Sequence, residues 1–166
     1  MAVLVSKPAP FFNDSDKVFS AVLGDGNIVD DFSFKAATKG KYAVVFFYPL
    51  DFTFVCPSEI IAFNNRLEEF KKRNVELISV SVDSQFTHSA WRNTAVDAGG
   101  IGPVGFTMVA DIKREIIQAF DVESDGGVAF RGSFLIDKDG VVQHQVVNNL
   151  PLGRNVDEML RMIDAL

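Results

Sequence analysis

Cys56 is the single cysteine of this chain, and its setting in the sequence is typical of a reactive sulfur. An apolar run over residues 42–48, rich in Val and Phe, predicts a buried strand that ends at Pro49. Residues 58–72 carry apolar side chains at three- and four-residue steps, which predicts an amphipathic helix with Pro57 in its first turn. Cys56 therefore lies at a helix N-terminus, where unpaired N–H groups and the helix dipole favour a thiolate over a thiol.

The neighbours of Cys56 decide between a reactive and an inert sulfur, because free cysteine is often a small buried hydrophobe. Thr53, on the loop between strand and helix, offers a hydroxyl to the sulfur or to an oxygen beside it. Glu59, one turn into the helix, can recruit an arginine from elsewhere in the fold. These residues favour the reactive interpretation.

Pro49, Thr53 and Cys56 match the Pro-x-x-x-Thr-x-x-Cys signature of peroxiredoxins. The stretch FFYPLDFTFVCPSE resembles the two-cysteine subgroup, which includes bacterial alkyl hydroperoxide reductase. The resemblance extends over nearly the whole chain, through VSVDSQFTHSAW, GGIGP, FTMVAD and AFRGSFLID.

The resemblance implies a thiol-dependent peroxidase that reduces hydrogen peroxide and organic hydroperoxides through a cysteine sulfenic acid, in antioxidant defence and peroxide signalling. It places the guanidinium of Arg131 near the sulfur, with Glu59 and Arg154 as the supporting pair that orients it. Without the resemblance, Arg131 would be assigned to the solvent face of a strand. No cofactor is expected. A redox-linked chaperone or holdase assembly is the alternative function.

The resemblance also implies partners. Residues 141–147 are expected to pair edge to edge with a second copy in a homodimer, and a contact around Phe52, Phe86 and Thr87 would join five dimers into a decameric ring. The alternative is that both phenylalanines turn into their own core. A thioredoxin-type or flavoprotein disulfide reductase is the expected partner of the full-length protein. Whether a tail with a resolving cysteine was removed or never existed stays open.

Other chemistries fit the sequence less well. The position of the second cysteine of a Cys-x-x-Cys pair is taken by Glu59, which excludes dithiol exchange at one site. His88 and His144 lack the context of a hydrolytic base, and one cysteine with two scattered histidines does not make a zinc site. Residues 99–102, Gly-Gly-Ile-Gly, do not link a strand to a helix as a dinucleotide loop must.

The elements needed to position these residues predict an α/β protein. The expected fold is thioredoxin-like, with a central mixed sheet flanked by helices and an added N-terminal hairpin. Beyond the segments already named, strands are expected at 17–23, 27–32, 75–82, 106–110 and 129–137, and helices at 84–94, 113–120 and 155–166.

Composition limits the remaining possibilities. With 166 residues and 48% hydrophobic side chains, the chain has the size of one domain, taken as residues 1–166. Sixteen basic against 22 acidic residues give a net charge of −6, which does not suggest a nucleic-acid partner. Neither a signal-length apolar core nor a membrane-length run is present, and a single cysteine fits a reducing compartment, so a cytoplasmic location is expected.

Overall fold

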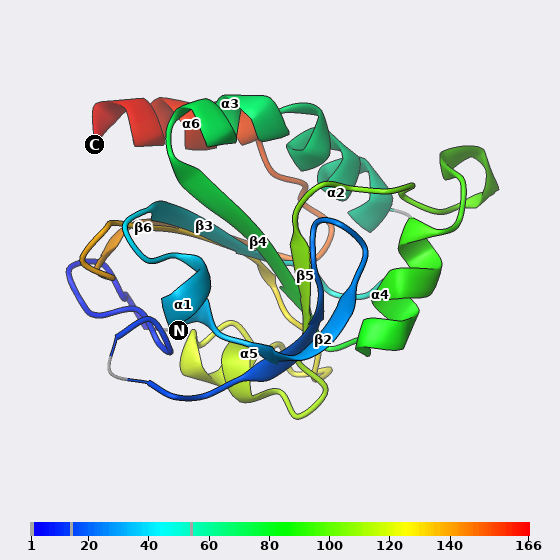
Figure 1. The fold of residues 1–166 in the computed structure, drawn as a ribbon, viewed down its shortest axis with the longest axis horizontal. Coiled ribbons are helices and arrows are strands. Elements are labelled where there is room, and N and C mark those ends of the chain that lie inside the picture. Colours follow the sequence, from blue (N-terminus) through cyan, green and yellow to red (C-terminus); the bar gives the residue numbers. More distant parts are fainter. Residues whose placement is uncertain (1, 14, 54) are drawn as a thin grey trace.

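The computed structural model describes residues 2–13, 15–53 and 55–166, which form a seven-stranded sheet with helices on both faces (Figure 1). The strands follow one another across the sheet in the order β2-β1-β5-β4-β3-β6-β7. Their bounds are Phe19–Val22 (β1), Ile28–Phe32 (β2), Tyr42–Phe47 (β3), Val75–Ser81 (β4), Thr107–Ala110 (β5), Arg131–Ile136 (β6) and Val142–Asn148 (β7). The predicted strands are all confirmed, with ends that differ by up to two residues.

The centre of the sheet is parallel and its borders are antiparallel. Strand β3 pairs in parallel with β4, with Val45 opposite Ile78, and β4 pairs in parallel with β5. On its other side β3 pairs antiparallel with β6, with Val44 opposite Leu135. The two hairpins β1–β2 and β6–β7 close the edges, so the predicted mixed sheet with an added N-terminal hairpin is confirmed.

The helices are α1 (Phe34–Ala37), α2 (Cys56–Asn65), α3 (Leu67–Lys72), α4 (Gln85–Arg92), α5 (Glu115–Ala119) and α6 (Val156–Ala165), with a 3₁₀ turn η1 at Val96–Ala98. In Figure 1, α2, α3 and α6 lie above the sheet, and α1 and α5 lie below it. The sheet is therefore the middle layer of three.

Strand β3 explains why both faces are covered, because its side chains alternate between two apolar cores. Val45 and Phe47 belong to the core under α1 and α5, while Val44 and Phe46 belong to the core under α2, α3 and α6. The Phe46 ring stacks on Phe63 of α2 with ring centroids 4.0 Å apart. This contact fixes α2, and with it the segment that carries Cys56, against the sheet.

One helix prediction was wrong in detail. Residues 58–72 were expected to form a single helix, but α2 ends at Asn65 and α3 begins at Leu67. Arg66, at φ −106° and ψ 9°, breaks the helix between them. The side-chain oxygen of Asn64 meanwhile accepts a hydrogen bond from the backbone N–H of Gly105 (2.9 Å). The apolar repeat continues across the break through Phe63 and Phe70, so the pattern could not reveal it.

The described residues form no helix long and apolar enough to cross a membrane.

Candidate active site

Cys56 is the first residue of α2, which begins two residues before the predicted start at residue 58, and the predicted position of Cys56 at a helix N-terminus is confirmed. Its side chain is fully buried. Pro57 follows in the first turn, where its missing N–H would have had no partner within the helix, so no intrahelical hydrogen bond is lost. Pro49, just beyond β3, is also buried. The sulfur thus lies where the central strand meets the positive end of a helix, in a site shielded from water.

Arg131 is the first residue of β6, the antiparallel neighbour of β3, and only 4% of its surface is exposed. Its Nη1 atom lies 3.3 Å from the Sγ atom of Cys56. Its Nε–H donates to the carbonyl oxygen of Leu150 at 2.6 Å, which fixes the plane of the guanidinium. Arg131 is therefore not on a solvent face but is aimed at the sulfur.

Glu59 joins two arginines in one buried cluster. Its Oε1 accepts a hydrogen bond from Nη1 of Arg131 (2.5 Å), and its Oε2 accepts one from Nε of Arg154 (2.7 Å). The backbone N–H of Arg154 also donates to Oε2 (2.9 Å). The three side chains come from α2, from β6 and from the loop before α6, so the fold must be complete before the cluster exists.

Arg154 is held by its surroundings as well as by Glu59. Its Nη1 donates to the carbonyl oxygen of Gly132 at 2.8 Å, and its guanidinium lies over the Phe46 ring, 5.3 Å from the ring centroid. Burial lowers the pKa of Arg154, and the Glu59 carboxylate acts in the opposite direction. The arginine stays protonated at any physiological pH, since its reference value is so high.

The formal charges of this cluster favour an ionised sulfur. Arg131 and Arg154 contribute two positive charges and Glu59 contributes one negative charge, so a neutral Cys56 leaves one positive charge in a buried site. A thiolate brings the cluster to zero net charge. Because uncompensated buried charge is costly, the cluster stabilises the form of the sulfur that acts as a nucleophile.

Thr53 lies on the loop before α2, but its hydroxyl donates to the carbonyl oxygen of Leu50 at 2.9 Å. In the part of the chain that the structure describes, no hydrogen bond joins Thr53 to Cys56. The structure thus brings together Cys56, Glu59, Arg131 and Arg154 and leaves Thr53 beside the cluster.

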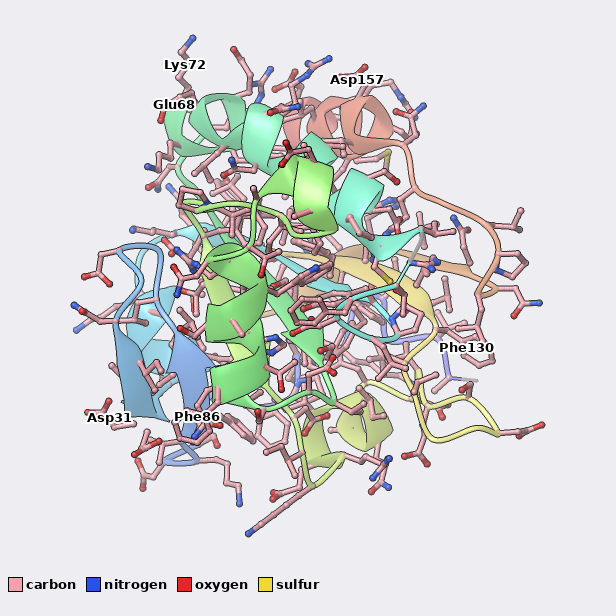
Figure 2. All side chains as sticks on the ribbon, turned by 90° about the vertical axis from the view of Figure 1, so that its right-hand side faces the viewer. Asp31, Glu68, Lys72, Phe86, Phe130 and Asp157 are labelled. Atoms are coloured by element: carbon pink, nitrogen blue, oxygen red, sulfur yellow. The ribbon has the colours of Figure 1, made fainter. Side chains whose placement is uncertain are left out.

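Phe52, Phe86 and Thr87 lie away from the sulfur cluster. Phe52 is 51% exposed and Phe86 is 67% exposed, so the alternative that both rings turn into their own core is wrong. Figure 2 shows Phe86 at the surface near the start of α4. Thr87 is half-buried, with its backbone N–H capped by Ser84.

Sequence reasoning missed two features of this region. The first is the backbone carbonyl of Leu150, which orients Arg131. A main-chain acceptor on a loop cannot be predicted from the residue types of the sequence. The other is a fully buried hydrogen-bonded group formed by Tyr48, Asp51 and His88. Asp51 and His88 are 37 residues apart, so only their places on the loop and on α4 bring them together.

Within the described ranges, no three His, Cys, Asp or Glu side chains are grouped so that they could hold a metal ion. Gly99 caps the 3₁₀ turn η1 with φ 89°, and residues 99–102 lead to a loop rather than into a helix. The local geometry is therefore not that of a dinucleotide-binding loop.

Comparison with known proteins identifies this arrangement. The profile of the AhpC/TSA family matches residues 6–145. The chain belongs to this family. It is 53% identical over 165 residues to alkyl hydroperoxide reductase C of Buchnera aphidicola subsp. Baizongia pistaciae, a match that covers 99% of this chain and 80% of that protein. It is 48% identical to peroxiredoxin-2 of Macaca fascicularis over 166 residues, covering 97% of this chain and 78% of that protein.

Solved structures agree with the sequence comparison. Reduced 2-Cys peroxiredoxin of Plasmodium vivax superposes with a TM-score of 0.91 at 47% identity, covering 99% of this chain and 82% of that one. The predicted thioredoxin-like fold and the predicted activity are both confirmed: the protein is a peroxiredoxin of the typical two-cysteine type, a thiol-dependent peroxidase that reduces peroxides.

Proposed function

We propose that Cys56 is the nucleophile of peroxide reduction. Its thiolate attacks the terminal oxygen of a hydroperoxide, an S–O bond forms as the O–O bond breaks, and the second oxygen leaves as an alkoxide or hydroxide that takes a proton from water. Sulfur is oxidised to the sulfenic acid and the peroxide is reduced to an alcohol or water. The observation that carries this proposal is the 3.3 Å contact between Arg131 Nη1 and Cys56 Sγ inside a buried cluster.

Arg131 has two roles in this proposal. Before the reaction it stabilises the thiolate, and during the reaction its N–H groups are donors for the charge that develops on the oxygens. Glu59 and Arg154 keep Arg131 in place, because Glu59 binds both guanidiniums at once. A donor that is already oriented loses no energy to reorganisation when the charge moves.

Thr53 and Pro49 complete the proposed site. The Thr53 hydroxyl donates a hydrogen bond to the Leu50 carbonyl, so the Thr53 oxygen remains available to accept a hydrogen bond from the O–H of an incoming peroxide. Pro49 is buried at the end of β3 and cannot donate a competing backbone hydrogen bond.

The test is peroxide consumption with dithiothreitol as reductant, measured for the wild type and for Cys56→Ser. We expect hydrogen peroxide and an organic hydroperoxide to be consumed by the wild type alone, while ester hydrolysis and insulin reduction stay at background for both proteins. Consumption by Cys56→Ser at the wild-type rate would refute the assignment of Cys56.

The proposed assembly is a homodimer that forms a decameric ring. Strand β7 is the last strand of the sheet. The backbone of Val142 at its start is hydrogen-bonded to Ser6 and Lys7, so the proposed pairing with the same strand of a second copy uses the outer edge beyond Val142. The exposure of Phe52 and Phe86 supports a second apolar contact with Thr87 between them. Sedimentation of the wild type would test this proposal, since a monomer at micromolar concentration contradicts it.

Recycling and location are also proposals. In the full-length protein we expect a thioredoxin-type or flavoprotein disulfide reductase to act on a disulfide with a second, resolving cysteine; in the 166-residue chain, an external thiol must reduce Cys56. The single free cysteine supports a reducing, cytoplasmic location. We treat residues 1–166 as one domain, which is supported by the continuous sheet.

A further inference from the structure

A second buried polar group lies beside the sulfur cluster, at the point where β3 leads into the loop that carries Thr53. The hydroxyl of Tyr48 donates to Oδ1 of Asp51 at 2.6 Å, and Nδ1 of His88 lies 2.6 Å from Oδ2 of the same carboxylate. The other ring nitrogen of His88, Nε2, lies 3.1 Å from the carbonyl oxygen of Val109 on β5. Tyr48 and His88 have no exposed surface, and Asp51 has very little.

The geometry fixes the number of protons in this group. A carbonyl oxygen only accepts hydrogen bonds, so Nε2 of His88 must carry a proton. Nδ1 faces a carboxylate that already accepts the Tyr48 hydroxyl, so a proton lies between Nδ1 and Asp51. A singly protonated imidazole opposite an ionised Asp51 would leave one of its two contacts without a donor. Nδ1 of His88 and Oδ2 of Asp51 therefore share one proton, which lies on one or the other of them.

The surroundings support this assignment. Burial raises the pKa of Tyr48, and the Asp51 charge acts in the same direction, so the phenol stays protonated as a donor. Burial also raises the pKa of Asp51, whereas its hydrogen bond to His88 lowers it. Asp83, after β4, is a further charged neighbour, and its Oδ2 accepts the Ser81 hydroxyl (2.6 Å) and the backbone N–H of Asp51 (2.9 Å).

This group holds the turn that presents Thr53. The Asp51 side chain is bound by Tyr48 and His88, and its backbone N–H is bound by Asp83, so the residue is fixed at both its side chain and its main chain. The next residue, Phe52, has φ 58°, a left-handed conformation that is unfavourable for a phenylalanine and is kept only when its surroundings enforce it. Thr53 follows directly, with its hydroxyl directed back to Leu50 within the same turn.

We propose that His88 is a positioning residue for peroxide reduction, which holds Asp51 through the shared proton and thereby sets the position of Thr53 relative to Cys56. The proposal rests on the roles of Cys56 and Thr53 given above. His88 touches neither the sulfur nor the substrate. Its effect on the rate comes from geometry alone, and misplacement of a reacting group by about 1 Å can slow a reaction by about 100-fold.

The first test needs no variant. In a nitrogen-15 NMR spectrum of protein labelled at histidine, recorded at pH 7.5, we expect Nε2 of His88 to be protonated and Nδ1 to be hydrogen-bonded through the proton that it shares with Asp51. His144 is the internal control: burial lowers its pKa from 6.5, so it should show one protonated nitrogen at this pH. An unprotonated Nε2 on His88, or an Nδ1 that takes part in no hydrogen bond, would overturn the proposal. This spectrum is independent of whether Cys56 reacts with peroxide.

The second test measures the rate of Cys56 oxidation in a single turnover for His88→Gln, Thr53→Val and the double variant. We expect His88→Gln to slow oxidation by about tenfold or more. In the Thr53→Val background the same substitution should add little, because the residue that His88 positions is no longer functional. Ala90→Gln places the same side chain on the exposed side of α4 and should keep the wild-type rate.

The outcomes separate the two proposals. Equal slowing by His88→Gln in both backgrounds, or no slowing in a folded variant, shows that His88 does not act through Thr53. A wild-type protein that leaves Cys56 unoxidised refutes the proposed function instead. If His88→Gln does not fold, the histidine spectrum of the wild type decides the question by itself.

Discussion

Replacing Arg131 with methionine removes the positive charge beside the sulfur and keeps an unbranched side chain in its place. Arg131 Nη1 lies 3.3 Å from Cys56 Sγ and 2.5 Å from Glu59 Oε1, and its Nε–H donates to the Leu150 carbonyl, so the substitution deprives three groups of a donor. Glu59 keeps its hydrogen bonds to Arg154, which limits the damage to the rest of the cluster. The change therefore tests the sulfur contact in particular.

The expected loss follows from the geometry. Two opposite unit charges 3.3 Å apart interact by about 5 kcal/mol at an effective dielectric constant of about 20. The net stabilisation of the thiolate is smaller than this Coulomb energy, because the Arg131 charge also interacts with Glu59 and because the desolvation of Arg131 opposes the attraction. Removing one donor from a developing negative charge costs about 100- to 1,000-fold in rate in other enzymes. We expect a loss of about 100-fold in the second-order rate of Cys56 oxidation.

The assay is a single-turnover measurement, in which reduced protein is mixed with excess peroxide and quenched for mass spectrometry at Cys56. Arg161→Met is the matched control, because Arg161 lies on the exposed side of α6 with 67% of its side chain accessible. This control should keep the wild-type rate. If Arg131→Met folds and reacts as fast as the wild type, the guanidinium has no part in the reaction.

Three further predictions concern stability and assembly. Glu59→Gln leaves two buried guanidiniums without their carboxylate and should lower the free energy of unfolding by about 3–5 kcal/mol. Urea titration followed by Trp91 fluorescence measures this change, and an unchanged midpoint would contradict a stabilising role for Glu59 in the cluster. Thr87→Arg should reduce the sedimentation coefficient from that of a ring to that of a dimer, and identical sedimentation of both proteins counts against the proposed contact. Burial raises the pKa of Asp111 to about 6, so between about pH 4 and 6 the native state keeps a proton that the unfolded state releases. The free energy of unfolding should therefore fall as the pH rises through this range. This pH dependence should be weaker in Asp111→Asn, and equal slopes in the two proteins would refute the prediction.

The parts of the fold that the sequence revealed are those with local signals. Strand β3 is an apolar run that follows Lys41 and ends before Pro49, and α4 and α6 begin at the capping residues Ser84 and Asn155. The position of Cys56 followed from Pro57 and the apolar repeat after it. The family signature then identified Arg131 and Arg154, which periodicity alone could not have placed near the sulfur.

The parts that the sequence did not reveal depend on tertiary contacts. The short helix α1 has only four residues, although Ser33, which caps it, was a usable signal. The break at Arg66 is hidden because the apolar repeat continues into α3. His88 had no recognisable context in the sequence, because its two hydrogen-bond partners, Asp51 and Val109, come from the loop after β3 and from β5.

The central claim is that Cys56 alone carries the oxidation. The most direct measurement is tandem mass spectrometry of the reduced protein after one equivalent of hydrogen peroxide, with dimedone present to trap sulfenic acid. Our account predicts one dimedone adduct per chain, located at Cys56, and one peroxide consumed for each adduct formed. Oxygen found on methionine instead, with Cys56 unmodified while peroxide is consumed, would contradict the account.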